Sequence, residues 1–241
     1  MTKINVHIVP VLSDNYVYIL EGADQKAAIV DPGEAGPVRN YLEDNNLKPE
    51  IILLTHHHGD HVAGTDTLRQ DYGCDIYGPA KDADRLPALD KPLDHQDSFN
   101  LFGQNVDVIE TPGHTKHHIC YYIADSDILL AGDTLFSIGC GRVFEGTMEQ
   151  MHNSLQFLKQ LPDETKIYCG HEYTLSNLKF ALSLNPDDKN LVQKMERVQQ
   201  KRDRGEPTMP AAMGEENRLN PFLRAENVEE FVDIRRKKDA A

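Results

Sequence analysis

Residues 55–61, Thr-His-His-His-Gly-Asp-His, decide how the fold and the chemistry of this sequence are interpreted. They directly follow the apolar run Ile-Ile-Leu-Leu at 51–54, which is typical of a buried strand. Four histidines and one aspartate, with nitrogen and oxygen donors, therefore lie where a strand ends and the chain turns. This pattern predicts a metal site at one edge of a sheet.

The spacing within this segment favours two metal ions over one. In an extended segment, residues two apart point the same way, so His56 and His58 can converge on one ion. Once the chain turns into a helix, Asp60 and His61 point elsewhere and can hold a second ion close by. Imidazole and carboxylate ligands suit zinc, iron or manganese, and the lack of a nearby cysteine argues against a structural zinc site.

Three further candidate ligands, His114, Asp133 and His171, each follow a strand-like run and a glycine. A glycine lets the backbone turn sharply, so that the next side chain can reach a shared site. Five histidines and two aspartates match a two-metal hydrolytic site, in which a bridging carboxylate holds ions about 3.5–4 Å apart. Taken singly, any of these histidines could instead be a surface or core residue, and a histidine cluster can bind metal adventitiously.

Composition limits the other functions that the chain can have. The 241 residues include 25 basic and 39 acidic side chains, for a net charge of −14, which opposes binding to nucleic acid or to an anionic membrane. There is no apolar run near the roughly 20 residues that cross a bilayer, and the first 20 residues lack the features of a signal peptide. We therefore expect a cytoplasmic protein whose four cysteines are reduced and either buried or inert.

The first two thirds of the chain are rich in short strands and the remainder is helical. We expect no strand after about Gly170 and a loop over residues 206–222. The expected strands are 4–9, 16–20, 27–31, 51–54, 75–79, 105–110, 118–124, 127–133 and 166–170, and the expected helices are 37–45, 62–72, 148–160, 175–184, 190–205 and a last one ending at 235–238.

Four motifs in this order, THHHGDH, PGHT, AGDT and CGHE, resemble the metallo-β-lactamase superfamily over residues from about 4 to 172. The resemblance implies an α+β fold, a four-layer αββα sandwich with the metals at one edge of the paired sheets. A finer resemblance is to the glyoxalase II enzymes, the hydroxyacylglutathione hydrolases. It rests on Asp14-Asn15-Tyr16, on GDTLFSIGCGRVFEGT from Gly132, on GHEYTLSNLKFAL from Gly170 and on RRKKD from Arg235.

This finer resemblance implies a catalytic domain over residues 1–172 and a small helical substrate-binding domain over 173–241. It also implies two divalent ions per chain, with zinc favoured and iron or manganese left open. Carried over by position, the resemblance implies that His56, His58 and His114 bind the first ion, that Asp60, His61 and His171 bind the second, and that Asp133 bridges the two. It also implies that Asp60 and Asp133 are the catalytic carboxylates. The implied substrate contacts are Arg142, Phe144, Tyr173, Arg235 and Lys238.

The sequence departs from the family pattern at two positions. Phe144 stands where some members have a tyrosine that helps to bind glutathione, so that hydroxyl contact is absent. His117 replaces a glycine that is usual in the family, and it either changes only the loop or adds an imidazole near the metals. The other histidines, at 7, 57, 95, 118 and 152, are interpreted as structural or surface residues.

The reaction implied by the resemblance is hydrolysis of S-(2-hydroxyacyl)glutathione, such as S-D-lactoylglutathione, to D-lactate and glutathione by a hydroxide that bridges the metals. This is the second step of methylglyoxal detoxification. Arg142 and the cluster from Arg235 to Lys238 could attract the glutathione carboxylates despite the acidic net charge, although cations at a helix C-terminus also have a purely structural explanation.

Alternative functions remain open at this point. They are another hydrolase of the same fold, such as a thioesterase, lactonase or β-lactamase, an iron-dependent persulfide dioxygenase, or a metal-binding module without activity. We expect a monomer whose only partner is a small glutathione thioester, with no nucleic-acid or membrane partner.

Overall fold

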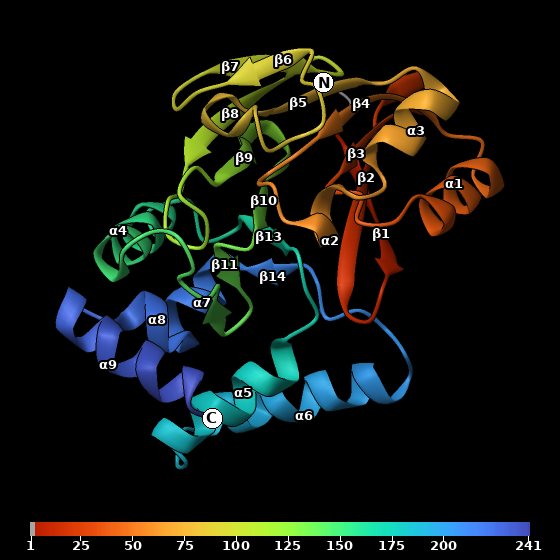
Figure 1. The fold of residues 1–241 in the computed structure, drawn as a ribbon. Coiled ribbons are helices and arrows are strands. Elements are labelled where there is room, and N and C mark those ends of the chain that lie inside the picture. Colours follow the sequence, from red (N-terminus) through yellow and green to blue (C-terminus); the bar gives the residue numbers. More distant parts are fainter. Residues whose placement is uncertain (1–2) are drawn as a thin grey trace. The chain divides into compact units, whose positions relative to one another are not determined.

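A computed structural model, drawn as a ribbon in Figure 1, describes residues 3–241. The chain divides into two compact units. Unit 1 is formed by the chain up to Glu110 together with His117–Gly132. Unit 2 is formed by Thr111–Lys116 together with Asp133–Ala241. The chain therefore passes from one unit to the other three times, after Glu110, after Lys116 and after Gly132. The first two crossings enclose the segment that contains His114, and the third directly precedes Asp133.

The first sheet of unit 1 has six strands in chain order. Its first three strands are antiparallel, and β3 to β6 are parallel. Short α-helices connect the first three parallel strands, whereas the crossover to the last strand contains only a three-residue 3-10 helix, Ala80–Asp82. The elements are β1 (Asn5–Val11), β2 (Asn15–Glu21), β3 (Lys26–Val30), α1 (Ala35–Asp44), β4 (Lys48–Leu53), α2 (Gly59–Val62), α3 (Thr65–Tyr72), β5 (Asp75–Pro79) and β6 (Lys91–Leu93).

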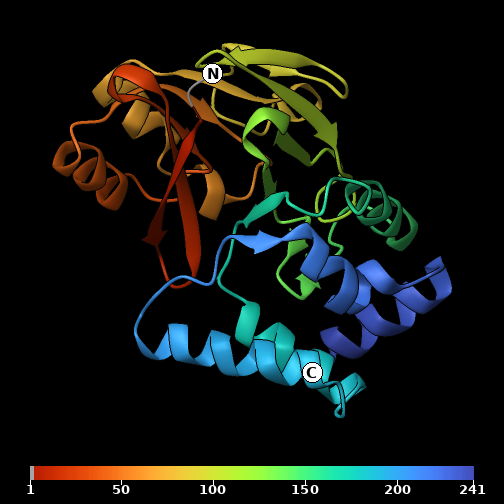
Figure 2. The ribbon, with the colours of Figure 1, turned by 180° about the vertical axis from the view of Figure 1, so that it is seen from behind.

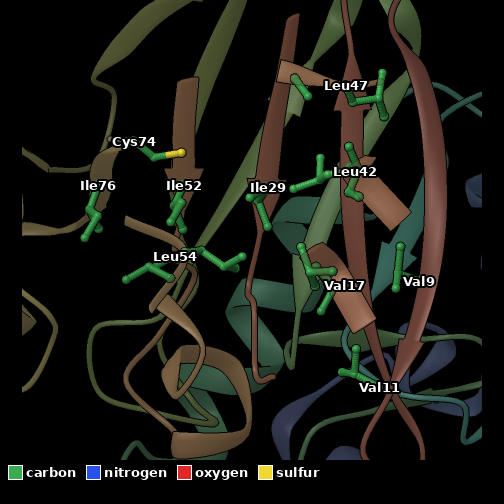
Figure 3. Packing of buried hydrophobic residues seen from close by; sticks show 14 residues of the cluster. Val9, Val11, Val17, Ile29, Leu42, Leu47, Ile52, Leu54, Cys74 and Ile76 are labelled. Atoms are coloured by element: carbon green, nitrogen blue, oxygen red, sulfur yellow. The ribbon is translucent and has the colours of Figure 1, made fainter. Parts of the chain in front are cut away.

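One hydrophobic cluster joins this sheet to its helices. Val38 and Leu42 of α1 and Leu68 of α3 are fully buried in the same cluster as the strand residues. Figure 3 shows labelled members from β1 to β5, including Ile29 and Ile52 of the neighbouring parallel strands. Burial of each such side chain contributes about 1.5–3 kcal/mol. This cluster supports the end of β4, from which the histidine segment departs.

The second sheet of unit 1 is antiparallel and packs against the first. Its strands are β7 (Ser98–Leu101), β8 (Gln104–Glu110), β9 (Ile119–Ile123) and β10 (Ile128–Gly132). The rings of Tyr77 on β5 and Phe99 on β7 meet edge to face at 5.2 Å. The buried hydroxyl of Tyr121 donates a hydrogen bond of 2.7 Å to the Leu54 carbonyl, and burial raises the pKa of Tyr121 well above its ordinary value. The phenol therefore stays a donor.

Unit 2 is mainly helical. Helices α5 and α6 lie side by side, as the front view and the reverse view in Figure 2 both show, and they share a buried cluster that includes Ile138, Leu178 and Leu191. The elements are β11 (Leu135–Phe136), β12 (Gly139–Cys140), α4 (Met148–Leu158), β13 (Lys166–Cys169), α5 (Thr174–Leu184), α6 (Lys189–Asp203), β14 (Ala211–Ala212), α7 (Met213–Leu219), α8 (Pro221–Arg224) and α9 (Val228–Asp239).

The structure corrects three expectations. The expectation of no strand after about Gly170 was wrong, because β14 pairs with β13. The segment expected to be a loop over 206–222 contains α7 and the start of α8. The helix expected over 62–72 is interrupted because the backbone N–H of Gly64 bonds to the Pro32 carbonyl at 2.8 Å, so α3 begins only at Thr65.

The cysteine prediction is confirmed. Cys74, Cys120, Cys140 and Cys169 are all free and buried. Burial raises the pKa of Cys74 and Cys140 to about 11 and that of Cys169 to about 12, so these thiols stay protonated at neutral pH. Among the described residues, none of the helices is both long and apolar enough to cross a membrane.

Candidate metal centre

The predicted ligands are divided between the two units. Unit 1 contains the four from the histidine segment, and unit 2 contains the three that follow strand-like runs later in the chain. The first group is His56, His58, Asp60 and His61, and the second is His114, Asp133 and His171.

In unit 1 the imidazoles gather beyond the end of β4. The ring centroid of His56 lies 4.7 Å from that of His58 and 4.2 Å from that of His61. Nε2 of His61 lies 3.6 Å from Oδ2 of Asp60. His56 and His61 are buried, whereas the Asp60 side chain is 40% exposed. Two of the imidazoles in this group are therefore buried, whereas the Asp60 carboxylate is accessible to solvent.

Asp31, which was not among the predicted site residues, contacts Thr55 and His61 of this segment. Its Oδ1 accepts from the Thr55 backbone N–H at 2.8 Å, its Oδ2 accepts from the Thr55 hydroxyl at 2.7 Å, and its Oδ2 also lies 3.1 Å from Nδ1 of His61. A carboxylate can only accept, so Nδ1 of His61 carries the hydrogen and its Nε2 presents a lone pair. The signal available in the sequence was the position of Asp31 directly after β3, since parallel β3 and β4 end at the same edge.

Asp60 is held by two features of the chain. Asn15 donates from Nδ2 to Oδ2 of Asp60 at 2.9 Å and to its carbonyl at 3.3 Å. Gly33 lies so close that a Cβ there would collide with the Asp60 carbonyl oxygen. Asn15 belongs to a motif that carried the family resemblance, and its contact with Asp60 gives that motif a physical role.

The remaining histidines near this group have other contacts. Nδ1 of His57 lies 3.2 Å from Oδ2 of buried Asp82. His118 is fully buried, with its ring centroid 4.9 Å from that of His56. Nδ1 of His117 lies 3.7 Å from Oε1 of Glu110. These placements agree with the interpretation of His57 and His118 as structural residues, and they associate His117 with a carboxylate on β8.

In unit 2 two imidazoles converge on one carboxylate oxygen. Oδ2 of Asp133 lies 3.3 Å from Nε2 of His114 and 3.3 Å from Nε2 of His171, and all three residues are buried. Nδ1 of His114 lies 2.9 Å from the Arg142 carbonyl, which can only accept, so Nε2 of His114 faces Asp133 as a lone pair. The Asp133 carboxylate therefore lies beside two imidazoles at once.

Two aromatic rings flank these histidines. Tyr173 stacks on His171 with ring centroids 4.8 Å apart and planes 2° from parallel. Phe144 lies tilted over His114 at 5.2 Å. Phe144 is 61% exposed and Tyr173 is 38% exposed, so both offer apolar surface beside metal-ligand candidates.

The predicted basic substrate contacts lie together, with one carboxylate among them. Arg235 is buried: Nε and Nη2 lie 3.1 and 2.9 Å from Oδ1 of Asp239, and Nη1 donates to the Cys140 carbonyl at 3.0 Å. Arg142 is exposed, with Nε 3.9 Å from the same Asp239 oxygen. Burial is the main cause that lowers the pKa of Lys238, and repulsion from Arg235 and Arg142 lowers it further. This mutual repulsion marks a local surplus of positive charge suited to an anion.

The donor set fits divalent transition metals. It consists of imidazole nitrogens and carboxylate oxygens, and at His61 and His114 a hydrogen-bond acceptor fixes the ring so that Nε2 is available. Calcium and magnesium prefer sites built from oxygen ligands alone. The arrangement therefore favours zinc, iron or manganese.

Asp31→Asn is expected to lower metal affinity by about 10- to 100-fold, because the amide nitrogen cannot accept the Nδ1 hydrogen of His61. Retention of metal against a chelator measures this effect. The matched control is Asp82→Asn, which alters an equally buried aspartate that faces His57, a histidine outside the predicted ligand set. Equal loss of metal in the two variants, or no loss in Asp31→Asn, would contradict this role for Asp31.

Comparison with known proteins gives two matches to family models that together cover almost the whole chain. Residues 11–171 match the metallo-beta-lactamase superfamily, and residues 172–241 match the hydroxyacylglutathione hydrolase C-terminus. These matches confirm the expected fold class, a metallo-β-lactamase fold followed by a helical C-terminal region.

Individual relatives agree with these matches. A hydroxyacylglutathione hydrolase of Pelagibacter ubique is 43% identical and covers 97% of this chain and 98% of its own length. One of Pseudomonas fluorescens is 44% identical, over 98% of this chain and 92% of its own length. Among solved structures, ETHE1 from Myxococcus xanthus superposes with a TM-score of 0.73 at 25% identity, covering 96% of this chain and 90% of its own.

Proposed function

This chain belongs to the hydroxyacylglutathione hydrolase family of the metallo-β-lactamase superfamily, and we propose from that membership that it hydrolyses S-(2-hydroxyacyl)glutathione. With S-D-lactoylglutathione the products are D-lactate and glutathione, the second step of methylglyoxal detoxification. The observation that carries this proposal is the match of residues 172–241 to the C-terminal region of these hydrolases, together with 42–45% identity to its curated relatives over most of the chain.

We propose a binuclear metal centre with the ligand set that the family resemblance implies. The proposal rests on the order of the motifs and on the geometry within each unit. Zinc is the favoured metal, with iron and manganese as alternatives. His56, His58 and His114 would hold the first ion, Asp60, His61 and His171 would hold the second, and Asp133 would be a ligand of both.

When bound, the ions supply a water that is nucleophilic at neutral pH and polarise the thioester carbonyl. The residues of the chain supply orientation and proton transfer. Asp60, the most accessible of the carboxylates and fixed by Asn15, orients the attacking water and accepts its proton. The Arg142 carbonyl holds His114 in the tautomer that leaves Nε2 available.

Glutathione recognition is assigned to the basic cluster and to the aromatic rings beside it. Arg142 and Lys238 attract the substrate carboxylates, while Arg235 holds Asp239 and the Cys140 carbonyl in place and adds to the positive potential. Tyr173 and Phe144 border the reacting group. The hydroxyl contact of the family tyrosine is absent at Phe144.

In this proposal residues 1–172 form the catalytic domain and residues 173–241 form the substrate-binding domain. This is a division by role, supported by the two family matches. The two compact units divide the chain by packing instead, because Asp133 and the segment after it pack with the helices. A monomeric state and a cytoplasmic location remain predictions.

The function is tested with purified protein of known metal content and with S-D-lactoylglutathione as substrate. We expect loss of the thioester absorbance together with equal amounts of D-lactate and glutathione. Parallel assays with a lactone, a β-lactam and glutathione persulfide, the last with an oxygen electrode, address the alternative functions. Faster turnover of one of these, with little thioester hydrolysis, would overturn the proposal.

A further inference from the structure

The β11–β12 hairpin, Leu135–Cys140, connects two residues to which the proposed function gives roles. Asp133 precedes it and Arg142 follows it, and the Gly141 N–H closes its base with a hydrogen bond of 3.2 Å to the Thr134 carbonyl. The Arg142 carbonyl also orients His114. The conformation of this hairpin therefore affects a bridging ligand, a second metal ligand and a substrate contact together.

The turn of the hairpin has an unfavourable backbone conformation. Ile138 has φ of 56°, in the left-handed region that β-branched residues avoid. Such a conformation is unfavourable for an isoleucine and persists only where the surrounding residues fix it. Ile138 is completely buried in the cluster between α5 and α6, so the turn is anchored in the helical part of unit 2.

Glu216 of α7 provides the polar part of this anchor. It is completely buried, and its Oε2 accepts from the Ile138 N–H at 2.6 Å while its Oε1 accepts from the Ser137 hydroxyl at 3.0 Å. Nδ2 of Asn220 lies 3.1 Å from the same Oε2. One carboxylate thus fixes the two residues at the tip of the hairpin, across 78 positions of sequence.

Two asparagines fix the hairpin carbonyls. Nδ2 of Asn220 donates to the carbonyls of Phe136 at 3.2 Å and Gly139 at 3.0 Å, and Nδ2 of Asn177 donates to the Ser137 carbonyl at 3.0 Å. Glu216 and these asparagines come from α5, α7 and the residue before α8. The hairpin is therefore held from several elements of the helical region.

The charge of Glu216 is balanced by Lys194 of α6, which is only 4% exposed. Nζ of Lys194 lies 3.1 Å from Oε1 of Glu216 and 2.6 Å from Oε2 of Glu215. Burial lowers the pKa of Lys194, but the two carboxylates outweigh it and raise that pKa, so the ammonium persists. A buried ion pair is weak evidence for stability, because hydrophobic residues of similar volume often stabilise as well. Its contacts with the hairpin point to a positional role.

We propose that Glu216 is a positioning residue that, by fixing the strained turn of the β11–β12 hairpin, sets the placement of Asp133 and Arg142 and so couples metal retention to substrate binding. The predicted effect on substrate binding rests on the proposed function. The predicted effect on metal retention depends only on Asp133 and His114 being metal ligands. Glu216 itself touches neither the metal ligands nor the substrate contacts named above.

Glu216→Gln and the matched control Glu215→Gln test this proposal. Both variants remove a carboxylate bound to Lys194, but only Glu216 contacts the hairpin. For Glu216→Gln we expect about tenfold faster loss of metal to dipicolinate and about tenfold higher KM for S-D-lactoylglutathione. For Glu215→Gln we expect both quantities to match the wild type. Thermal unfolding is recorded for both variants.

Folded Glu216→Gln with unchanged metal retention and KM would overturn the proposal, and so would equal changes in Glu215→Gln. Gly139→Ala is the second variant, because a Cβ at that position would collide with the amide of Asn177 and displace the hairpin. It should reproduce both changes even if Glu216→Gln does not fold, and a folded Gly139→Ala with neither change counts against the proposal. If the wild type does not hydrolyse the thioester, the proposed function fails, but the rate of metal loss to dipicolinate still tests the predicted effect on metal retention.

Discussion

Asp133→Ala is expected to lower kcat/KM on the order of 10³-fold and to reduce the metal content from two ions per chain towards one. Oδ2 of Asp133 lies 3.3 Å from Nε2 of His114 and 3.3 Å from Nε2 of His171. Without it the two imidazoles lose their common partner, and in the proposed ligand assignment the two ions lose their shared ligand. Metal analysis after gel filtration and steady-state kinetics measure the two effects.

Asp187→Ala, at an exposed aspartate in unit 2, is the matched control and should leave both values unchanged. Asp133→Asn adds a finer comparison, because it keeps the volume of the side chain and removes its charge. Two retained ions and normal turnover in Asp133→Ala would show that the proposed ligand assignment is wrong.

Arg235→Ala is expected to raise KM for the glutathione thioester by about 10- to 100-fold while changing kcat much less, because charge-assisted hydrogen bonds contribute about 1.5–3 kcal/mol. Arg235 occupies the Asp239 carboxylate, which lies 3.9 Å from Nε of Arg142. Once Arg235 is removed, Asp239 can pair with Arg142 and cancel the charge that attracts the substrate. The positive charge near the bound substrate would then fall twice, once by the loss of buried Arg235 and once by the pairing of Arg142.

Arg236→Ala serves as the control for this variant, since Arg236 is the exposed neighbour on the same helix. Arg235→Lys keeps the charge, but an ammonium cannot span Asp239 and the Cys140 carbonyl as the guanidinium does, so an intermediate KM is expected. A thermal melt separates loss of binding from loss of folding. An unchanged KM in folded Arg235→Ala would refute its proposed role in glutathione binding.

The metal-ligand segments could be located from sequence because each ligand stands beside a local signal. The histidine segment begins just after an apolar strand, and Asp133 follows another with a glycine between them. Such signals need only a few consecutive residues, so they remain readable without the fold. They also explain why the strand and helix pattern of unit 1 was largely predicted.

The features that could not be predicted depend on contacts between distant residues. In sequence Glu216 resembles an exposed residue of a polar segment, and the apolar partner surface that buries it comes from other helices. Arg235 and Arg236 cannot be distinguished from the sequence pattern, yet Arg235 is buried against Asp239 and Arg236 is exposed. The role of Asp31 likewise depends on the parallel pairing of β3 with β4.

The most direct test of a two-metal thioester hydrolase is titration of metal-free protein with zinc while hydrolysis of S-D-lactoylglutathione is followed. The proposal predicts that activity rises until two equivalents per chain are bound and that Asp133→Ala does not follow this curve. Full activity at one equivalent, with no gain from the second, would contradict the binuclear mechanism, and no hydrolysis at any metal content would contradict the assigned reaction.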